Sequence, residues 1–206
     1  EYKEKSASLV SVVLNNRQLC DIELILNGAF APLNGFLGKS DYESVLNNMT
    51  LSSSKVWPMP IMLDVDEEFI TTNSITQGTE IALREKEGFL IGILTVSDIW
   101  TPDKSIEAEA IYGTTNIHHP GVNHLFNSTK NIYIGGEITG IQSPKHYDYS
   151  LLRHSPHELK EQFEKLGWEK IVAFQTRNPM HRAHKEIAYR AATEVQANLL
   201  IHPVVG

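Results

Sequence analysis

Two kinds of hydrophobic pattern divide the chain. Up to about residue 150, short apolar runs alternate with turn residues, whereas from about residue 155 helix-like and strand-like segments alternate. Side chains repeat every two residues along a strand and every 3.6 residues along a helix, so the change of pattern indicates a change of architecture. The chain is therefore predicted to hold two domains, residues 1–150 and residues 151–206.

The first domain is predicted to be mostly β and barrel-like. Its clearest signal is a hairpin, in which the apolar runs Glu80–Arg84 and Phe89–Val96 flank the turn Glu85–Gly88. Other runs with strand character are Asp21–Leu26, Lys130–Ile138 and Trp57–Leu63, the last limited by its two prolines to an edge or extended position.

Capping residues predict where two helices begin. Ser40 is a good N-cap, and Glu43 three residues later completes a capping box for a short helix to about residue 49. Ser155 is followed by Pro156, which suits the first helical position, and by Glu158 as the capping-box partner. The helix that starts at Ser155 is the first of the alternating helices and strands of the second domain.

The second domain continues as strand, helix and strand, over Lys170–Phe174, Pro179 to about residue 196, and Leu199–Val205. This order predicts one βαβ unit, the building block of a parallel sheet covered by helices. One unit cannot complete a sheet with both faces buried. The chain is therefore expected to be truncated inside its second domain.

Composition places the chain among globular proteins, with 206 residues of which 41% are hydrophobic. Its single cysteine, Cys20, excludes an internal disulfide framework and favours a reducing, cytoplasmic setting. Cys20 is expected to be a small buried residue rather than a nucleophile. The apolar runs are far shorter than the roughly 20 residues of a membrane span, and the first residues do not resemble a signal peptide, so no membrane partner is expected.

Charge is distributed unevenly between the two domains. Residues 1–150 contain 10 Lys and Arg against 19 Asp and Glu, a net charge of −9, whereas residues 151–206 contain 8 against 6, a net charge of +2. Nucleic-acid binding needs clustered Lys and Arg, so the acidic first domain argues against a nucleic-acid partner. An anionic substrate would be attracted to the second domain.

The most informative segment is the run Gln175–His184, which joins the first strand of the second domain to its helix. Asn178 is predicted to be the N-cap and Pro179 the first helical residue. His181 and His184, three residues apart, would then share one face in the first turn. Helix N-termini attract phosphate or sulfate because their N–H groups are unpaired and carry partial positive charge. The run therefore predicts an anion site of the kind used in nucleotide chemistry.

Each polar side chain of this run suits a site that holds two anions. Arg177 offers a planar fork that can bind a tetrahedral oxyanion through two hydrogen bonds. Gln175 supplies a neutral donor, and Thr176 and Asn178 add a hydroxyl and an amide.

Two alternative interpretations of the histidine pair are a metal site and ordinary surface histidines. A metal site is disfavoured because the pair lacks the glutamate of a zincin motif. Surface histidines would be the simpler interpretation of the pair alone, but the surrounding strand, turn and Pro-started helix favour a nucleotide site. A second group, His118, His119 and His124, is interpreted as part of a solvated loop.

With these motifs in view, the chain resembles the ATP sulfurylase (sulfate adenylyltransferase) family over nearly its whole length. The core of the resemblance is Val172–His184. Supporting segments are Ala31–Leu37, Trp57–Ile61, Tyr112–Thr115, His119–Val122, Leu166–Trp168 and His202–Gly206.

The resemblance implies a mixed fold. Members of this family have an N-terminal PUA-like β-barrel domain followed by an α/β nucleotidyltransferase domain of Rossmann-like type, here truncated after one βαβ unit. Because members of this family are usually homo-oligomers, the resemblance also implies that the full-length protein forms a homo-oligomer. Its second nucleotide motif, Gly-Arg-Asp-His, does not occur in this sequence, so half of the nucleotide site is expected to lie outside these residues.

The resemblance also implies the reaction of ATP with sulfate to give adenylyl sulfate and pyrophosphate, with Mg²⁺ on the nucleotide phosphates and no protein ligand for the metal. Carried over by motif, Gln175 and Arg177 bind sulfate, and the two histidines stabilise the transition state at the phosphates. The residues implied in catalysis are Thr176, Arg177, Asn178, His181 and His184, and those implied in ATP binding are the same five with Gln175.

Two other functions remain open from the sequence. One is a catalytically incomplete module that binds sulfate or nucleotide. The other is a pantetheine- or nicotinamide-type adenylyltransferase. That reading is disfavoured because those enzymes carry His-x-Gly-His, whereas here Arg182 and Ala183 separate the two histidines.

Overall fold

The computed structural model describes residues 2–204, with side chains from residue 4 onward. The chain divides into two compact units, residues 1–148 and residues 149–206. Each unit has its own sheet. Among the described residues, no helix is both long and apolar enough to cross a membrane.

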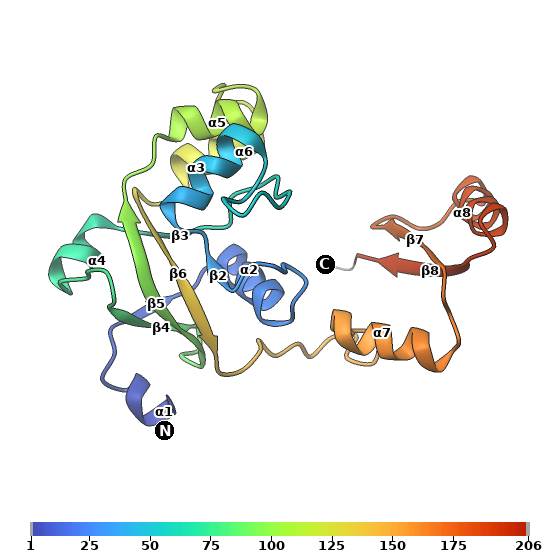
Figure 1. The fold of residues 1–206 in the computed structure, drawn as a ribbon, viewed down its shortest axis with the longest axis horizontal. Helices are drawn as coiled ribbons and strands as arrows, with labels where there is room; N and C mark the ends of the chain where they lie inside the picture. Colours follow the sequence, from blue (N-terminus) through green and yellow to red (C-terminus); the bar gives the residue numbers. More distant parts are fainter. Residues whose placement is uncertain (1, 205–206) are drawn as a thin grey trace. The chain divides into compact units, whose positions relative to one another are not determined.

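A six-stranded mixed sheet forms the centre of the first unit (Figure 1). Its strands are β1 (Ser11–Val13), β2 (Gly35–Phe36), β3 (Leu63–Val65), β4 (Glu80–Arg84), β5 (Leu90–Trp100) and β6 (Ile132–Gly140). The order is β1-β4-β5-β6-β2, with β3 also paired to β6. The pairings of the described residues therefore form an open path rather than a closed ring. The hairpin predicted around Glu85–Gly88 is confirmed as β4 and β5.

Helices are more numerous in this unit than a mostly β prediction allows. They are α1 (Tyr2–Ser6), α2 (Asn16–Leu26), α3 (Lys39–Asn48), α4 (Glu67–Thr72), α5 (Lys104–Tyr112) and α6 (Pro120–Asn127). In Figure 1, α3, α5 and α6 gather near one end of the sheet. The architecture of the first unit is therefore a mixed sheet with helices.

The predicted strand over Asp21–Leu26 is wrong, because this segment is the second half of α2. The helix starts earlier, where Asn15 caps it and exchanges hydrogen bonds with Gln18 in a capping box. Ile22 and Ile25, three residues apart, are then buried on one face. A six-residue apolar run fits either a strand or part of a helix, and the packing of this face decides the outcome.

Cys20 is exposed, so its predicted burial is wrong. It lies two residues from both Gln18 and Ile22, which are buried, and residues two apart point to different sides of a helix. Partial desolvation, with Glu23 and Asp21 nearby, raises the pKa of the thiol. A raised pKa disfavours the reactive thiolate.

Helix α3 also begins before its predicted cap. Gly38, not Ser40, is the N-cap, and it makes no side-chain capping bond. A Cβ atom at Gly38 would lie 2.7 Å from Oδ2 of Asp98, so a larger residue here would have to displace the Asp98 carboxylate. Glu43 lies 3.8 Å from the ammonium group of Lys39 instead of completing a capping box.

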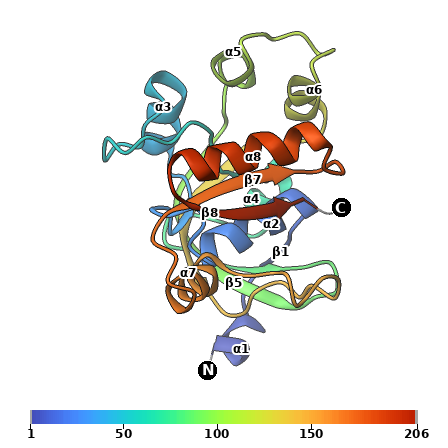
Figure 2. The ribbon, with the colours of Figure 1, turned by 90° about the vertical axis from the view of Figure 1, so that its right-hand side faces the viewer.

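The second unit contains the predicted βαβ arrangement. Its elements are α7 (Pro156–Lys165), β7 (Ile171–Thr176), α8 (Arg182–Glu194) and β8 (Asn198–Pro203). Strands β7 and β8 pair in parallel, and α8 lies along them in Figure 2. The capping box of α7 is confirmed, with the Ser155 N–H donating to Oε2 of Glu158 at 2.7 Å. The capping bonds lower the pKa of the Glu158 carboxyl.

Candidate active site

The carboxyl end of β7 begins the candidate site. Gln175 and Thr176 are the last two residues of the strand, and Arg177 and Asn178 form the bend that follows. The Thr176 hydroxyl accepts a hydrogen bond from the Asn178 N–H at 3.1 Å and donates to the Asn178 carbonyl at 2.9 Å. Thr176 therefore holds the bend in shape, and this bend leaves the side chains of Arg177 and Asn178 exposed.

The start of α8 differs from the prediction. The helix begins at Arg182 with His181 as N-cap, so Asn178 is not the cap and Pro179 is not the first helical residue. Asn178 is instead hydrogen bonded to Thr176, and three further residues precede the helix.

The capping interaction at α8 is made by a histidine. The His181 N–H donates to Nδ1 of His184 at 3.3 Å, the position normally filled by glutamate or glutamine in a capping box. His181 therefore precedes the helix and His184 lies in its first turn. Their rings still meet, with centroids 5.4 Å apart and planes at 61°.

The surroundings of His184 determine which of its nitrogens can donate. Nδ1 accepts from the backbone, so in the neutral ring the hydrogen lies on Nε2. Phe174 on β7 contacts the ring, with centroids 5.8 Å apart. His184 is half-buried and His181 is exposed. The arrangement offers an oriented Nε2–H donor at the start of a helix.

Neighbouring side chains near the end of β7 lie on opposite faces of the strand. Phe174 faces α8 through its contact with His184, and alternation along the strand places Gln175 on the opposite face. The structure therefore brings together Thr176 with Asn178 and His181 with His184, but it does not place Gln175 beside the histidines. Gln175 is paired in register with His202 of β8, a residue that the sequence did not single out for the site.

Metal-binding groups of three or more His, Cys, Asp or Glu are absent from the residues that the structure describes. His118 and His119 lie just before α6, and His124 lies within it. His124 was expected in a loop, so that detail of the prediction is wrong.

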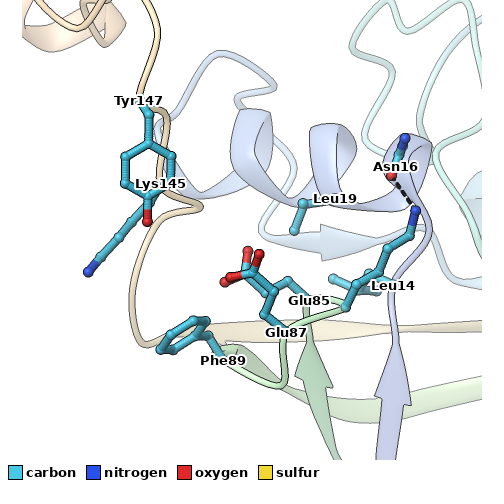
Figure 3. A pocket seen from close by; sticks show the side chains of 9 residues that line it. Leu14, Asn16, Leu19, Glu85, Glu87, Phe89, Lys145 and Tyr147 are labelled. Atoms are coloured by element: carbon cyan, nitrogen blue, oxygen red, sulfur yellow. Dashed lines mark hydrogen bonds between the residues drawn. The ribbon is translucent and has the colours of Figure 1, made fainter.

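The first unit has hollows of its own. One, of about 140 Å³, lies at the β4–β5 turn and is lined by residues that include Glu85, Glu87, Leu14 and Phe89 (Figure 3). Another, of about 410 Å³, lies along Pro32–Gly38. Neither is lined by a residue of the Gln175–His184 run.

Comparison with known proteins assigns both parts of the chain. Residues 1–143 match the PUA-like domain family, and residues 150–206 match the ATP-sulfurylase family. The chain is similar to sulfate adenylyltransferases of Mycosarcoma maydis (49% identity, 100% of this chain, 36% of the relative) and Eremothecium gossypii (53%, 94% and 38%). The Saccharomyces cerevisiae enzyme is 49% identical over 98% of this chain and 39% of its own length.

Among solved structures, the chain is similar to a hexameric APS kinase from Thiobacillus denitrificans. The TM-score is 0.79 at 33% identity, over 100% of this chain and 36% of that protein. The chain thus spans little more than a third of the length of the relatives it matches. These matches show that the chain belongs to the sulfate adenylyltransferase (ATP sulfurylase) family and carries a PUA-like domain.

Proposed function

We propose that this chain contributes to a sulfate adenylyltransferase, which converts ATP and sulfate to adenylyl sulfate and pyrophosphate. The observation that carries the proposal is the β7–α8 connection, where a bend with an exposed arginine leads to a helix N-terminus with two contacting imidazoles. The names of the relatives support the same activity.

The start of α8 is the proposed phosphate site. The first backbone N–H groups of a helix have no acceptor within it, and the helix dipole adds partial positive charge there. His184 adds its Nε2–H donor, and exposed His181 can donate beside it. These donors are in place before the reaction, so they can stabilise the charge that develops at the α-phosphorus without rearrangement.

Arg177 and Gln175 are the proposed sulfate ligands. The Arg177 guanidinium can bind two sulfate oxygens at once, and the Gln175 amide can donate to another. Thr176 and Asn178 shape the bend and complete the ATP site. In this mechanism a sulfate oxygen attacks the α-phosphorus and pyrophosphate leaves in line, so no protein nucleophile is needed. The main contribution of the protein is to bring two anions together and offset their repulsion.

Magnesium enters this proposal as part of the substrate. The Gln175–His184 run has amide and hydroxyl oxygens but no carboxylate, which is the usual protein ligand of magnesium. The side chains of this run therefore do not fit a resident magnesium site. The ion would arrive on the ATP phosphates and neutralise part of their charge.

The proposal extends to the organisation of the whole protein. It takes residues 1–150 as a PUA-like domain with barrel-like closure and residues 151–206 as the first βαβ unit of the catalytic domain. Further parts of the proposal are a homo-oligomer and a cytoplasmic location, the latter supported by the single, unpaired Cys20.

A pyrophosphate-release assay with MgATP and sulfate tests the proposed reaction. It should be run on residues 1–206 and on the chain extended to the length of its relatives. Sulfate-dependent turnover in the extended chain supports the proposal. Binding of sulfate or ATP without turnover in both proteins would instead identify a binding module, and turnover with a different acceptor would contradict the assignment.

A further inference from the structure

His202 lies at the carboxyl end of β8, next to the end of β7. In the parallel register, Gln175 pairs with His202 and Thr176 with Pro203. Neighbouring strands are about 4.8 Å apart, and paired residues of parallel strands direct their side chains to the same face. Gln175 and His202 therefore lie side by side on the face of β7 and β8 that α8 does not cover.

Both side chains are exposed, and so is Ala173, the next residue of β7 on this face. The small side chain of Ala173 leaves space beside Gln175. His184 cannot serve this face, because it contacts Phe174 on the other side of the strand. An anion held by Gln175 thus has His202 as its nearest imidazole on the paired strand.

We propose that His202 is a further anion-binding residue of the site, which holds the acceptor sulfate together with Gln175. This inference rests on the proposed function. It divides the site at the carboxyl ends of β7 and β8: His181 and His184 bind the nucleotide phosphates from the α8 side, Gln175 and His202 bind sulfate from the other side, and the two anions meet beyond the strand ends.

The chemistry of this face favours an anion over a cation. The residues that β7 and β8 direct to it, besides Gln175 and His202, are Ile171, Ala173, Asn198 and Leu200, none of which is charged. No carboxylate on these strands therefore competes for the imidazole. A ring N–H hydrogen bonded to a doubly charged sulfate is a charge-assisted bond, stronger than a neutral one.

The test is steady-state kinetics of His202→Ala in the chain extended to the length of its relatives. We expect the KM for sulfate to rise about tenfold and the KM for ATP to stay within about twofold, because one charge-assisted contact to one substrate is removed. His202→Gln keeps an N–H donor and should recover part of the sulfate affinity. Asn198→Ala is the matched control, since it alters the same strand and face roughly 13 Å away and should change neither KM.

The outcomes separate this inference from the proposed function. A wild-type protein without sulfate-dependent pyrophosphate release would overturn the proposed reaction and this inference with it. An active wild-type protein whose sulfate KM is unaffected by His202→Ala, or whose two KM values rise equally, would overturn the role of His202 alone. Recovery by His202→Gln would show that the loss comes from the missing donor rather than from altered packing.

Discussion

The two units differ in how much of their apolar surface they bury. The first unit encloses a large cluster around the sheet, in which Ile22, Leu63, Ile81, Leu94 and Ile134 are completely buried. In the second unit, the buried hydrophobic residues among those described are Ala188 and Ala192, and both are small. The same helix α8 leaves Ile187 61% and Tyr189 63% exposed. Within residues 1–206, the first unit therefore has a core of its own, whereas the second unit, which holds the candidate site, buries few apolar side chains.

Because of this difference, we expect the two units to respond differently to substitution. Substitutions that destabilise the fold most should lie in the first unit, and those that change catalysis without unfolding the protein should lie in the second. Four substitutions test this difference, in order of decreasing expected effect.

The largest effect on stability is expected for Leu94→Ala in β5. Leu94 is completely buried in the core, so truncation should lower the free energy of unfolding by about 2–5 kcal/mol. Ile187→Ala, on exposed α8, should change it by less than about 0.5 kcal/mol. Urea denaturation measures both values. Equal losses in residues 1–206 would contradict the difference in burial between Leu94 and Ile187.

His184→Ala should reduce turnover without unfolding the first unit. Loss of one preorganised donor to the developing charge typically lowers kcat by about 100- to 1000-fold. Steady-state kinetics measures this effect, and circular dichroism checks the fold. His157→Ala, an exposed histidine on α7 of the same unit, is the matched control and should leave kcat unchanged. If both variants are equally active, His184 does not act on the phosphates.

Arg177→Ala should raise the KM for sulfate at least about tenfold, because a charge-assisted contact of roughly 1.5–3 kcal/mol is lost. Arg190→Ala provides the control, since it removes an exposed arginine that bonds Glu186 at 2.6 Å within α8. Sulfate titrations of initial rate measure both variants. Unchanged kinetics for Arg177→Ala would remove it from the sulfate site.

The smallest effect concerns a buried carboxyl of the first unit. Glu107 accepts hydrogen bonds from Tyr42 at 2.9 Å and Tyr133 at 3.0 Å, and burial raises its pKa despite these bonds. Its folded pKa exceeds the unfolded value, so its contribution to stability is complete below the ordinary value near 4.5 and is lost as pH rises through the raised pKa.

Glu107→Gln should therefore abolish this pH dependence while changing stability by only about 1 kcal/mol. Unfolding measured at about pH 4 and about pH 7 checks the result. If the pH dependence of the variant matched that of the wild type, the dependence would have to come from other groups.

Local signals predicted the parts of the fold that local interactions determine. The β4–β5 hairpin followed from its turn, where Gly88 has φ of 88°, and the start of α7 followed from Ser155 and Glu158. The strand predicted over Asp21–Leu26 was wrong because this run was considered without the helix cap at Asn15. The parallel pairing of β1 with β4 joins Ser11 to Ala82, and no local pattern specifies such a distant contact.

The sequence predicted which segment holds the candidate site, but not how its residues are arranged in space. The residue types of Gln175–His184 indicated anion chemistry, yet the helix starts at Arg182 because His184 acts as the capping partner of His181, a role usually held by an acid or amide. His202 was not singled out because its pairing with Gln175 depends on the register of β8. Only the three-dimensional structure specifies that register.

The central claim is that the β7–α8 connection belongs to a site that transfers an adenylyl group to sulfate. The most direct measurement is the formation of labelled adenylyl sulfate from radiolabelled sulfate and MgATP, catalysed by the chain extended to the length of its relatives. We predict that the labelled product forms together with pyrophosphate and that its rate falls sharply in His184→Ala. Absence of labelled adenylyl sulfate from the folded wild-type protein, or an unchanged rate in the variant, would contradict the claim.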